Sequence, residues 1–138
     1  MTSVLAHEYG HFLDYYAGKN KFASGDSFSK GRIYDFTGKL SWHKKLLTLF
    51  DDAMYNVYWN DEGMPTNYQK INVKRSKYFR SRPEIFARLF QAYILERLKT
   101  LKIHNPFLQS SRYESSMPKY IDASRSFWAM RKIIRMIY

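Results

Sequence analysis

Cysteine is absent from the 138 residues. Disulfides, thiolate metal sites and a cysteine nucleophile are therefore excluded, and the absence fits a reducing compartment such as the cytoplasm. No stretch approaches the roughly 18–20 consecutive apolar residues of a membrane span, so an integral membrane protein is not expected. Hydrophobic residues nevertheless make up 45% of the chain and aromatic residues 18%. That composition excludes a disordered chain and supplies one core for one domain over residues 1–138.

Acidic residues are few. The chain has 12 Asp and Glu residues and 23 Lys and Arg residues, which gives a formal net charge of +11. The excess lies in the second half, because residues 69–96 carry seven basic and two acidic groups and residues 97–138 carry nine and two. A basic surface of this kind attracts phosphate backbones or acidic partners without reading sequence. A merely solubilising surface explains the composition equally well.

Hydrophobic periodicity predicts a mainly α fold with about four helices and long loops. The expected helices span residues 2–17, 41–59, 83–101 and 122–137. In the second of these, apolar residues recur at three- and four-residue intervals, which is typical of one buried stripe. The segments between the helices are rich in glycine, proline and polar residues, and two of them are about twenty residues long. Loops of that length are usually functional or mobile.

A potential metal-binding motif lies in the first predicted helix. Residues 7–11 read His-Glu-Tyr-Gly-His, so His7 and His11 project from the same helical face. Two imidazoles at that spacing suit Zn²⁺, and Glu8 is placed to accept a proton from a metal-bound water. Asp14 follows on the same face and could orient a ligand imidazole, although a solvent-facing acid is the simpler interpretation of that residue. Two structural histidines remain the alternative for the motif as a whole.

A catalytic zinc site needs a third protein ligand. The metzincin pattern is excluded because Asp14 and Ala17 occupy the positions of its glycine and third histidine. The remaining histidines, His43 and His104, are candidates, and among the carboxylates Glu84 stands out in the first turn of a strongly apolar helix. Ser81 and Glu84 also have the spacing of a capping box, in which the glutamate only satisfies a backbone N–H. Spacing alone leaves the ligand and the capping box equally supported.

Two segments together resemble a known family. Residues 4–16, Val-Leu-Ala-His-Glu-Tyr-Gly-His-Phe-Leu-Asp-Tyr-Tyr, resemble the active-site helix of zincin-like metallopeptidase domains. Residues 81–93, Ser-Arg-Pro-Glu-Ile-Phe-Ala-Arg-Leu-Phe-Gln-Ala-Tyr, resemble the second signature of these domains. The pair is similar to the large polyvalent protein-associated domain of phages and mobile elements. Residues 105–108 and 118–120 and the apolar last helix also fit that resemblance.

The resemblance implies a zinc metallopeptidase with a glutamate as third ligand. His7, His11 and Glu84 would hold Zn²⁺, Glu8 would act as general base, and a protein or peptide would be the substrate. It also implies a cytoplasmic location, in a bacterial host cell or after delivery by a phage, and a larger parent polypeptide. Zincin domains have a sheet before the motif helix, and here the motif begins at residue 7, so we expect an N-terminally incomplete domain that lacks this sheet. A catalytically degenerate zincin-like module is the alternative.

Further residues are candidates for supporting roles. A tyrosine or histidine could stabilise the negative charge that develops during hydrolysis, and the candidates are Tyr78, Tyr93 and His104. Nucleic-acid binding is a different hypothesis, because a basic run interleaved with aromatic residues suits single strands. That run comprises Lys70, Lys74, Arg75, Lys77, Arg80 and Arg82. A solvated loop is the simpler interpretation of the same residues.

The first helix also carries apolar residues away from the metal face. Val4, Leu5, Phe12 and Leu13 would pack on the preceding elements of a complete zincin-like domain. Leaving large apolar side chains uncovered forgoes about 1.5–3 kcal/mol each. We therefore expect the other helices of the chain to cover this face, with self-association as the alternative.

Overall fold

The computed structural model describes residues 3–17, 40–104 and 117–137 of the chain. Their helices are α1 (Ser3–Tyr15), α2 (Leu40–Tyr58), α3 (Asn67–Asn72), α4 (Arg82–Thr100), α5 (Tyr120–Ala123), a 3₁₀ turn (Ser124–Ser126) and α6 (Phe127–Ile137). The described residues form no strand, and their one β-bridge joins Trp59 and Pro65. The expectation of a mainly α fold is thus confirmed. None of the described helices has the length and hydropathy to cross a membrane.

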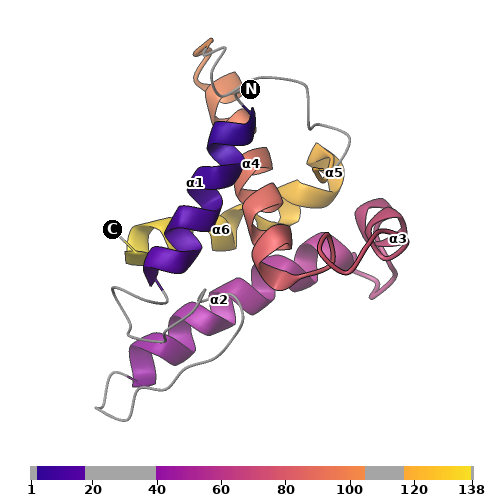
Figure 1. Ribbon diagram of the computed structural model, residues 1–138, viewed down its shortest axis with the longest axis horizontal. Helices are drawn as coiled ribbons and strands as arrows, with labels where there is room; N and C mark the ends of the chain where they lie inside the picture. The colour runs from indigo at the N-terminus through magenta and orange to yellow at the C-terminus, as the bar shows by residue number, and fades with distance from the viewer. Residues whose placement is uncertain (1–2, 18–39, 105–116, 138) are drawn as a thin grey trace.

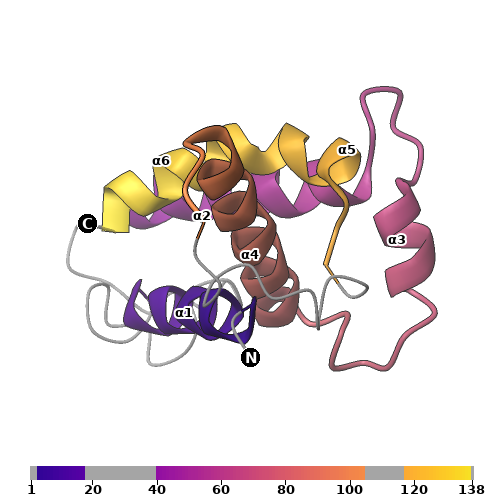
Figure 2. The same ribbon diagram turned by 90° about the horizontal axis from the view of Figure 1, so that it is seen from above.

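The helices form layers around α4. Viewed from above, α1 lies on one side of α4, and α2 and α6 lie together on its other side (Figure 2). Helix α3 stands at one end, beyond the end of α2 (Figure 1). Because α4 is covered from both sides, residues 84–92 are buried without interruption. This position places the first turn of α4 between the apolar core and α1.

One apolar cluster fills the space between α2, α4 and α6. Phe50 of α2 stacks on Phe86 of α4 with ring centroids 4.7 Å apart, and both are fully buried. From α6, Met130, Ile133 and Ile137 complete this cluster. The stripe predicted from the periodicity of residues 41–59 and the apolar face of the last helix are therefore the surfaces that meet in the core. Burial of each such side chain contributes about 1.5–3 kcal/mol.

Helix α3 was missed in the sequence. It has only six residues, too few for a periodic pattern to emerge, and it is held by local hydrogen bonds. The Thr66 hydroxyl caps it by accepting from the backbone N–H of Gln69 at 3.2 Å, and donates to the Val57 carbonyl at 2.6 Å. The Asn72 side chain then donates to the Phe79 carbonyl at 3.0 Å. These bonds fix the path of the chain from α2 to the start of α4.

Helix α1 is covered on one face only. Leu13 is buried at 1% exposure, as expected, but Leu5 and Phe12 are each 53% exposed. The expectation that other helices of the chain cover these two side chains is therefore wrong for the described part of the structure, while the side chain of Val4 lies outside it. The physical reason is that α1 turns its polar face, with His7 and Asp14, toward α4.

Candidate metal centre

The crossing of α1 over α4 depends on Gly10. A Cβ atom at this position would lie 3.0 Å from the Ala87 Cα and 3.2 Å from the Phe90 Cβ. Only glycine permits this approach without a shift of the two helices. The close crossing brings the face of α1 that carries His7 and His11 against the first turn of α4, where Glu84 lies.

His7, His11 and Glu84, here called the His–Glu cluster, converge at this crossing. The Nε2 atom of His7 lies 3.1 Å from Oε1 of Glu84, and that of His11 lies 2.9 Å from Oε2. Both distances are below the roughly 4 Å required of atoms that bind one zinc ion at about 2.0–2.1 Å. One ligand atom from each residue lies within 4.8 Å of the others. Glu84 thus faces the histidine pair, as predicted.

The capping-box alternative for Glu84 is wrong. Ser81 is the N-cap of α4, but its side chain makes no cap hydrogen bond and instead donates to the Tyr78 carbonyl at 2.8 Å. Glu84 itself is fully buried, with its carboxylate in contact with the imidazoles. A buried carboxylate is costly unless it is paired, so its position requires the surrounding cations and donors.

The electrostatics keep Glu84 anionic. Burial by itself raises the pKa of this carboxyl, but the hydrogen bond with His11 and the adjacent His7 imidazole outweigh burial and hold the pKa far below its usual range. The hydrogen bond to Glu84 in turn raises the pKa of His11, and the charges of Glu8 and Asp14 act in the same direction. A fixed anion beside two imidazoles is the donor set that zinc prefers.

Arg88 forms an ion pair with the Glu84 carboxylate. One turn further along α4, its guanidinium nitrogen lies 2.8 Å from Oε1, and its side chain is only 7% exposed. The same guanidinium lies 5.1 Å from the centre of the Phe79 ring, and Arg75 lies 5.3 Å from that ring. The segment between α3 and α4 therefore packs onto Arg88. Sequence reasoning missed this residue, although its spacing from Glu84 is that of an i,i+4 ion pair.

The other candidates near the motif lie at or beside the cluster. Glu8 is exposed, and its charge raises the pKa of His11, which indicates that the two groups are close. Asp14 is fully buried, so its interpretation as a solvent-facing acid is wrong. Tyr78 is 60% exposed and close enough to Glu84 to interact with its carboxylate. Partial burial and the neighbouring Glu84 carboxylate raise the Tyr78 pKa.

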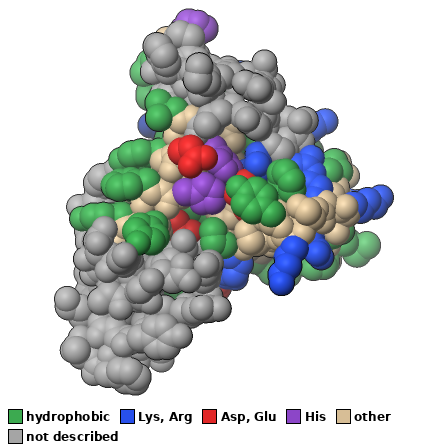
Figure 3. All heavy atoms as spheres, viewed as in Figure 1, with side chains coloured by type: hydrophobic (Ala, Val, Ile, Leu, Met, Phe, Trp, Pro, Cys, Tyr) green, Lys and Arg blue, Asp and Glu red, His purple; other side chains and the backbone are tan. Residues whose placement is uncertain are grey.

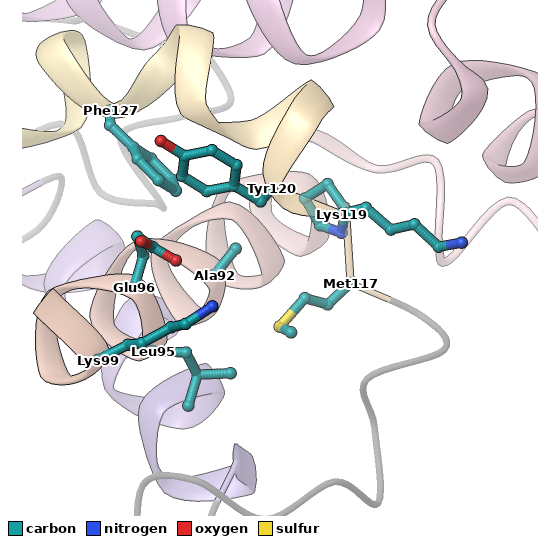
Figure 4. Close-up of a pocket in the computed structure, with 9 residues that line it drawn as sticks. Ala92, Leu95, Glu96, Lys99, Met117, Lys119, Tyr120 and Phe127 are labelled. Atoms are coloured by element: carbon teal, nitrogen blue, oxygen red, sulfur yellow. The ribbon is translucent and has the colours of Figure 1, made fainter.

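Two sequence candidates are not brought to the cluster. The Tyr93 ring packs edge-on against Phe127 of α6 at 5.5 Å. Phe127 lines a separate cavity of about 390 Å³ between α4 and the 117–127 segment, with Glu96, Lys99 and Tyr120 (Figure 4). His104 is exposed beyond the C-terminal end of α4, roughly 25 Å along the helix from Glu84 at 1.5 Å per residue. The side chain of His43 lies outside the described residues.

The basic run is divided by the structure. Lys70, Lys74, Lys77 and Arg80 are exposed. Arg82 pairs with Asp51, and Arg75 lies over the Phe79 ring. Lys70, Lys74, Lys77 and Arg80 are thus the exposed positive charges of this run, and none of them forms an ion pair with a carboxylate in the described parts of the chain.

Comparison with known families gives one match. Residues 71–132 match the family described as large polyvalent protein-associated domain 1. The matched region contains Glu84 and Arg88, whereas His7 and His11 precede it. No curated protein and no solved structure matches the chain. Residues 71–132, which include α4, α5, the first half of α6 and one member of the His–Glu cluster, are therefore similar to the large polyvalent protein-associated domain 1.

Proposed function

We propose that this chain is a zinc-dependent hydrolase of peptide bonds, with His7, His11 and Glu84 as metal ligands. The observation that carries the proposal is the approach of both Nε2 atoms to the two oxygens of one buried carboxylate, at 3.1 and 2.9 Å. Tetrahedral ligands at zinc lie about 3.3 Å apart, so each of these pairs needs only a small separation to admit the ion. Two neutral imidazoles and one carboxylate are also the ligand types of catalytic zinc sites.

When bound, zinc would polarise the scissile carbonyl and make a water molecule acidic enough to attack it near neutral pH. The Glu8 carboxylate would take the proton of the attacking water and deliver it to the nitrogen of the leaving amine. Its exposure beside the cluster suits this role, because the water and the substrate must reach it. The Tyr78 hydroxyl would donate a hydrogen bond to the oxygen on which negative charge develops.

The match over residues 71–132 supports a part of this proposal only. The family's description associates the domain with large polyvalent proteins, which fits the expected larger parent polypeptide of phage or mobile-element origin. It says nothing of hydrolysis, and the two histidines precede the matched region. The enzymatic proposal therefore depends on the geometry of the cluster.

Two measurements test the proposal. Elemental analysis of protein purified without chelator should give about one zinc per chain, and His11→Ala should lower that content sharply. Glu8→Gln should keep the metal and abolish hydrolysis of an unspecific peptide substrate, because the amide has the size of the carboxylate but accepts no proton. Glu62→Gln, an exposed change in the loop after α2, is the matched control and should leave both unchanged. A chain that takes up no zinc when the ion is supplied would contradict the metal assignment.

A further inference from the structure

The two sides of the His–Glu cluster differ in chemistry. On the face that shows the histidines, hydrophobic side chains cover α1 on one side, and Lys and Arg side chains gather on the other side toward α3 (Figure 3). The first side presents Leu5, Tyr9 and Phe12, which are 53%, 41% and 53% exposed. On the second side, Lys77 and Arg80 are exposed in the segment directly before α4. A chain bound across the cluster would meet both surfaces.

The apolar side is shaped to receive a side chain. Tyr9 packs against Phe12 and Phe90 with ring centroids 5.6 and 6.0 Å apart. Next to these rings lies a cavity of about 250 Å³ lined by Leu5, Ala6, Tyr9, Phe90 and Ile94. Leu5 and Tyr9 lie about half a turn around α1 from His7 and His11, so the cavity is on the other flank of the helix that carries the two histidines. Contiguous exposed apolar surface on a protein often marks a site that binds a partner or a ligand.

The basic side is held in a defined position. Backbone bonds from Phe79 to Ser76 and from Arg80 to Lys77, at 3.1 and 3.2 Å, close the segment into turns. Asn72 fixes the Phe79 carbonyl at 3.0 Å. Within this segment, Lys77 and Arg80 flank Tyr78, and the segment leads directly into the first turn of α4, which carries Glu84. Neither basic side chain forms an ion pair with a described carboxylate, unlike Arg82, which pairs with Asp51. Their charges are therefore open to a partner beside the site.

We infer that the site selects polypeptides that carry acidic residues on one side of the scissile bond and a large apolar residue on the other. This inference rests on the proposed hydrolytic function. An extended chain advances about 3.3–3.6 Å per residue, so residues within two or three positions of the bond reach both surfaces. Opposite charges favour the acidic side near Lys77 and Arg80. Burial in the cavity beside Tyr9 favours the apolar side.

Internally quenched peptides test the preference. One set combines Asp and Glu on one side of a central bond with Leu or Phe on the other, in both chain directions. In matched peptides Lys replaces the acidic residues, or Ser replaces the apolar one. We expect one direction of the acidic–apolar peptide to be cleaved with at least tenfold higher kcat/KM than its Lys counterpart, with the ratio falling as salt screens the charges. Equal cleavage of all peptides would overturn the inference.

Charge reversal identifies the residues responsible. Lys77→Glu with Arg80→Glu should invert the preference between the acidic and the basic peptide. Arg131→Glu with Arg135→Glu makes the same change in net charge on exposed residues of α6 and should leave the preference intact. An inversion by the α6 variant as well would show a general charge effect and overturn the assignment to this side of the cluster.

Binding provides a readout that does not need turnover. Zinc-loaded Glu8→Gln protein should bind the fluorescent acidic–apolar peptide at least tenfold more tightly than the basic one. If this preference holds while the unsubstituted protein cleaves nothing, the surface assignment stands and the proposed hydrolysis fails. No measurable peptide binding would overturn the inference. Displacement of the peptide by a single-stranded oligonucleotide that binds more tightly would also overturn it, in favour of nucleic-acid binding by the same basic residues.

Discussion

The interface of α2 with α6 and that of α1 with α4 are built on different principles. Between α2 and α6, the buried side chains that the structure describes are apolar, and next to them Ser126 of the 3₁₀ turn donates its hydroxyl to the Ala53 carbonyl at 2.6 Å. Helices α1 and α4, by contrast, bury the polar residues His7, Asp14, Glu84, Arg88 and Gln91. The first interface stabilises the fold through apolar burial, whereas the second buries polar groups at a cost in stability. Buried polar groups that lower stability in this way are expected at functional sites.

The polar interface also contains incompletely satisfied groups. Among the described residues, no hydrogen-bond partner is present for Nδ1 of His7 or for either polar side-chain atom of Gln91. The Oε1 atom of Glu84 is close to His7 and Arg88, but no contact has the alignment of a hydrogen bond. Unsatisfied buried groups cost about 1–3 kcal/mol each. The α1–α4 interface is thus the place where bound metal and water would add most to stability.

Truncation in the apolar interface should have the largest effect on the fold. Ile133→Ala removes a fully buried side chain of α6 and should lower the free energy of unfolding by about 2–5 kcal/mol. Urea denaturation measures the change, and zinc affinity of the folded protein should stay the same. Trp128→Ala on the same helix, at a residue 63% exposed, should change stability by only about 0.5 kcal/mol. A loss of zinc affinity in Ile133→Ala would show that the two interfaces are coupled.

Removal of the Arg88 guanidinium, which pairs with Glu84, should mainly lower the affinity for zinc. Arg88→Met keeps the length of the side chain but leaves Glu84 without its ion pair, and zinc affinity should fall by about 10–100-fold, the usual cost of losing a group that orients a ligand. Competition with a chromophoric chelator measures it. Arg97→Met, at an exposed residue of the same helix, is the control. Tighter binding in Arg88→Met would mean that repulsion between the guanidinium and the metal outweighs its orienting effect.

Enlargement of Gly10 should separate the two helices. In Gly10→Ala, the new methyl would lie 3.0 Å from the Ala87 Cα. Overpacking costs about 1–3 kcal/mol, offset by about 1 kcal/mol from the better helix propensity of alanine. Thermal unfolding should show a lower melting temperature, and competition with a chelator should show a lower affinity for zinc. Gly63→Ala, which meets no atom within 4 Å at a φ of +75°, should show only the cost of backbone strain and keep zinc affinity.

The pH dependence of the metal-free protein should be the smallest effect. The pKa of His11 is raised in the folded state, so its stabilising contribution is complete below its unfolded value of 6.5 and is lost as pH rises through the higher folded value. The pKa of Glu84 is lowered, so its contribution is complete above its unfolded value of 4.5 and is lost as pH falls from there through the lower folded value. Urea midpoints should therefore decline above about pH 6.5. His11→Gln should flatten this decline, and an unchanged decline would contradict the assignment to His11.

The sequence predicted long helices better than short segments. The expected helices at residues 41–59 and 83–101 are within one residue of α2 and α4, because apolar periodicity and Pro83 mark them. The last expected helix, 122–137, corresponds to α5, the 3₁₀ turn and α6 together. Helix α3 could not be predicted because its six residues depend on the Thr66 cap and on tertiary bonds from Asn72 and Asp122.

For the candidate site, the sequence by itself determined which residues share a helical face. The spacing of His7 and His11 fixes their common direction through the 3.6-residue period, and Pro83, which marks the start of an apolar helix, places Glu84 in a first turn. Only the tertiary structure decided between a metal ligand and a capping box, because the choice depends on what lies opposite Glu84. The tertiary structure also showed that Arg88 pairs with Glu84 and that the side chains of Leu5 and Phe12 are exposed. Such facts depend on the contacts between helices far apart in the chain, which the close approach at Gly10 sets and which no local pattern encodes.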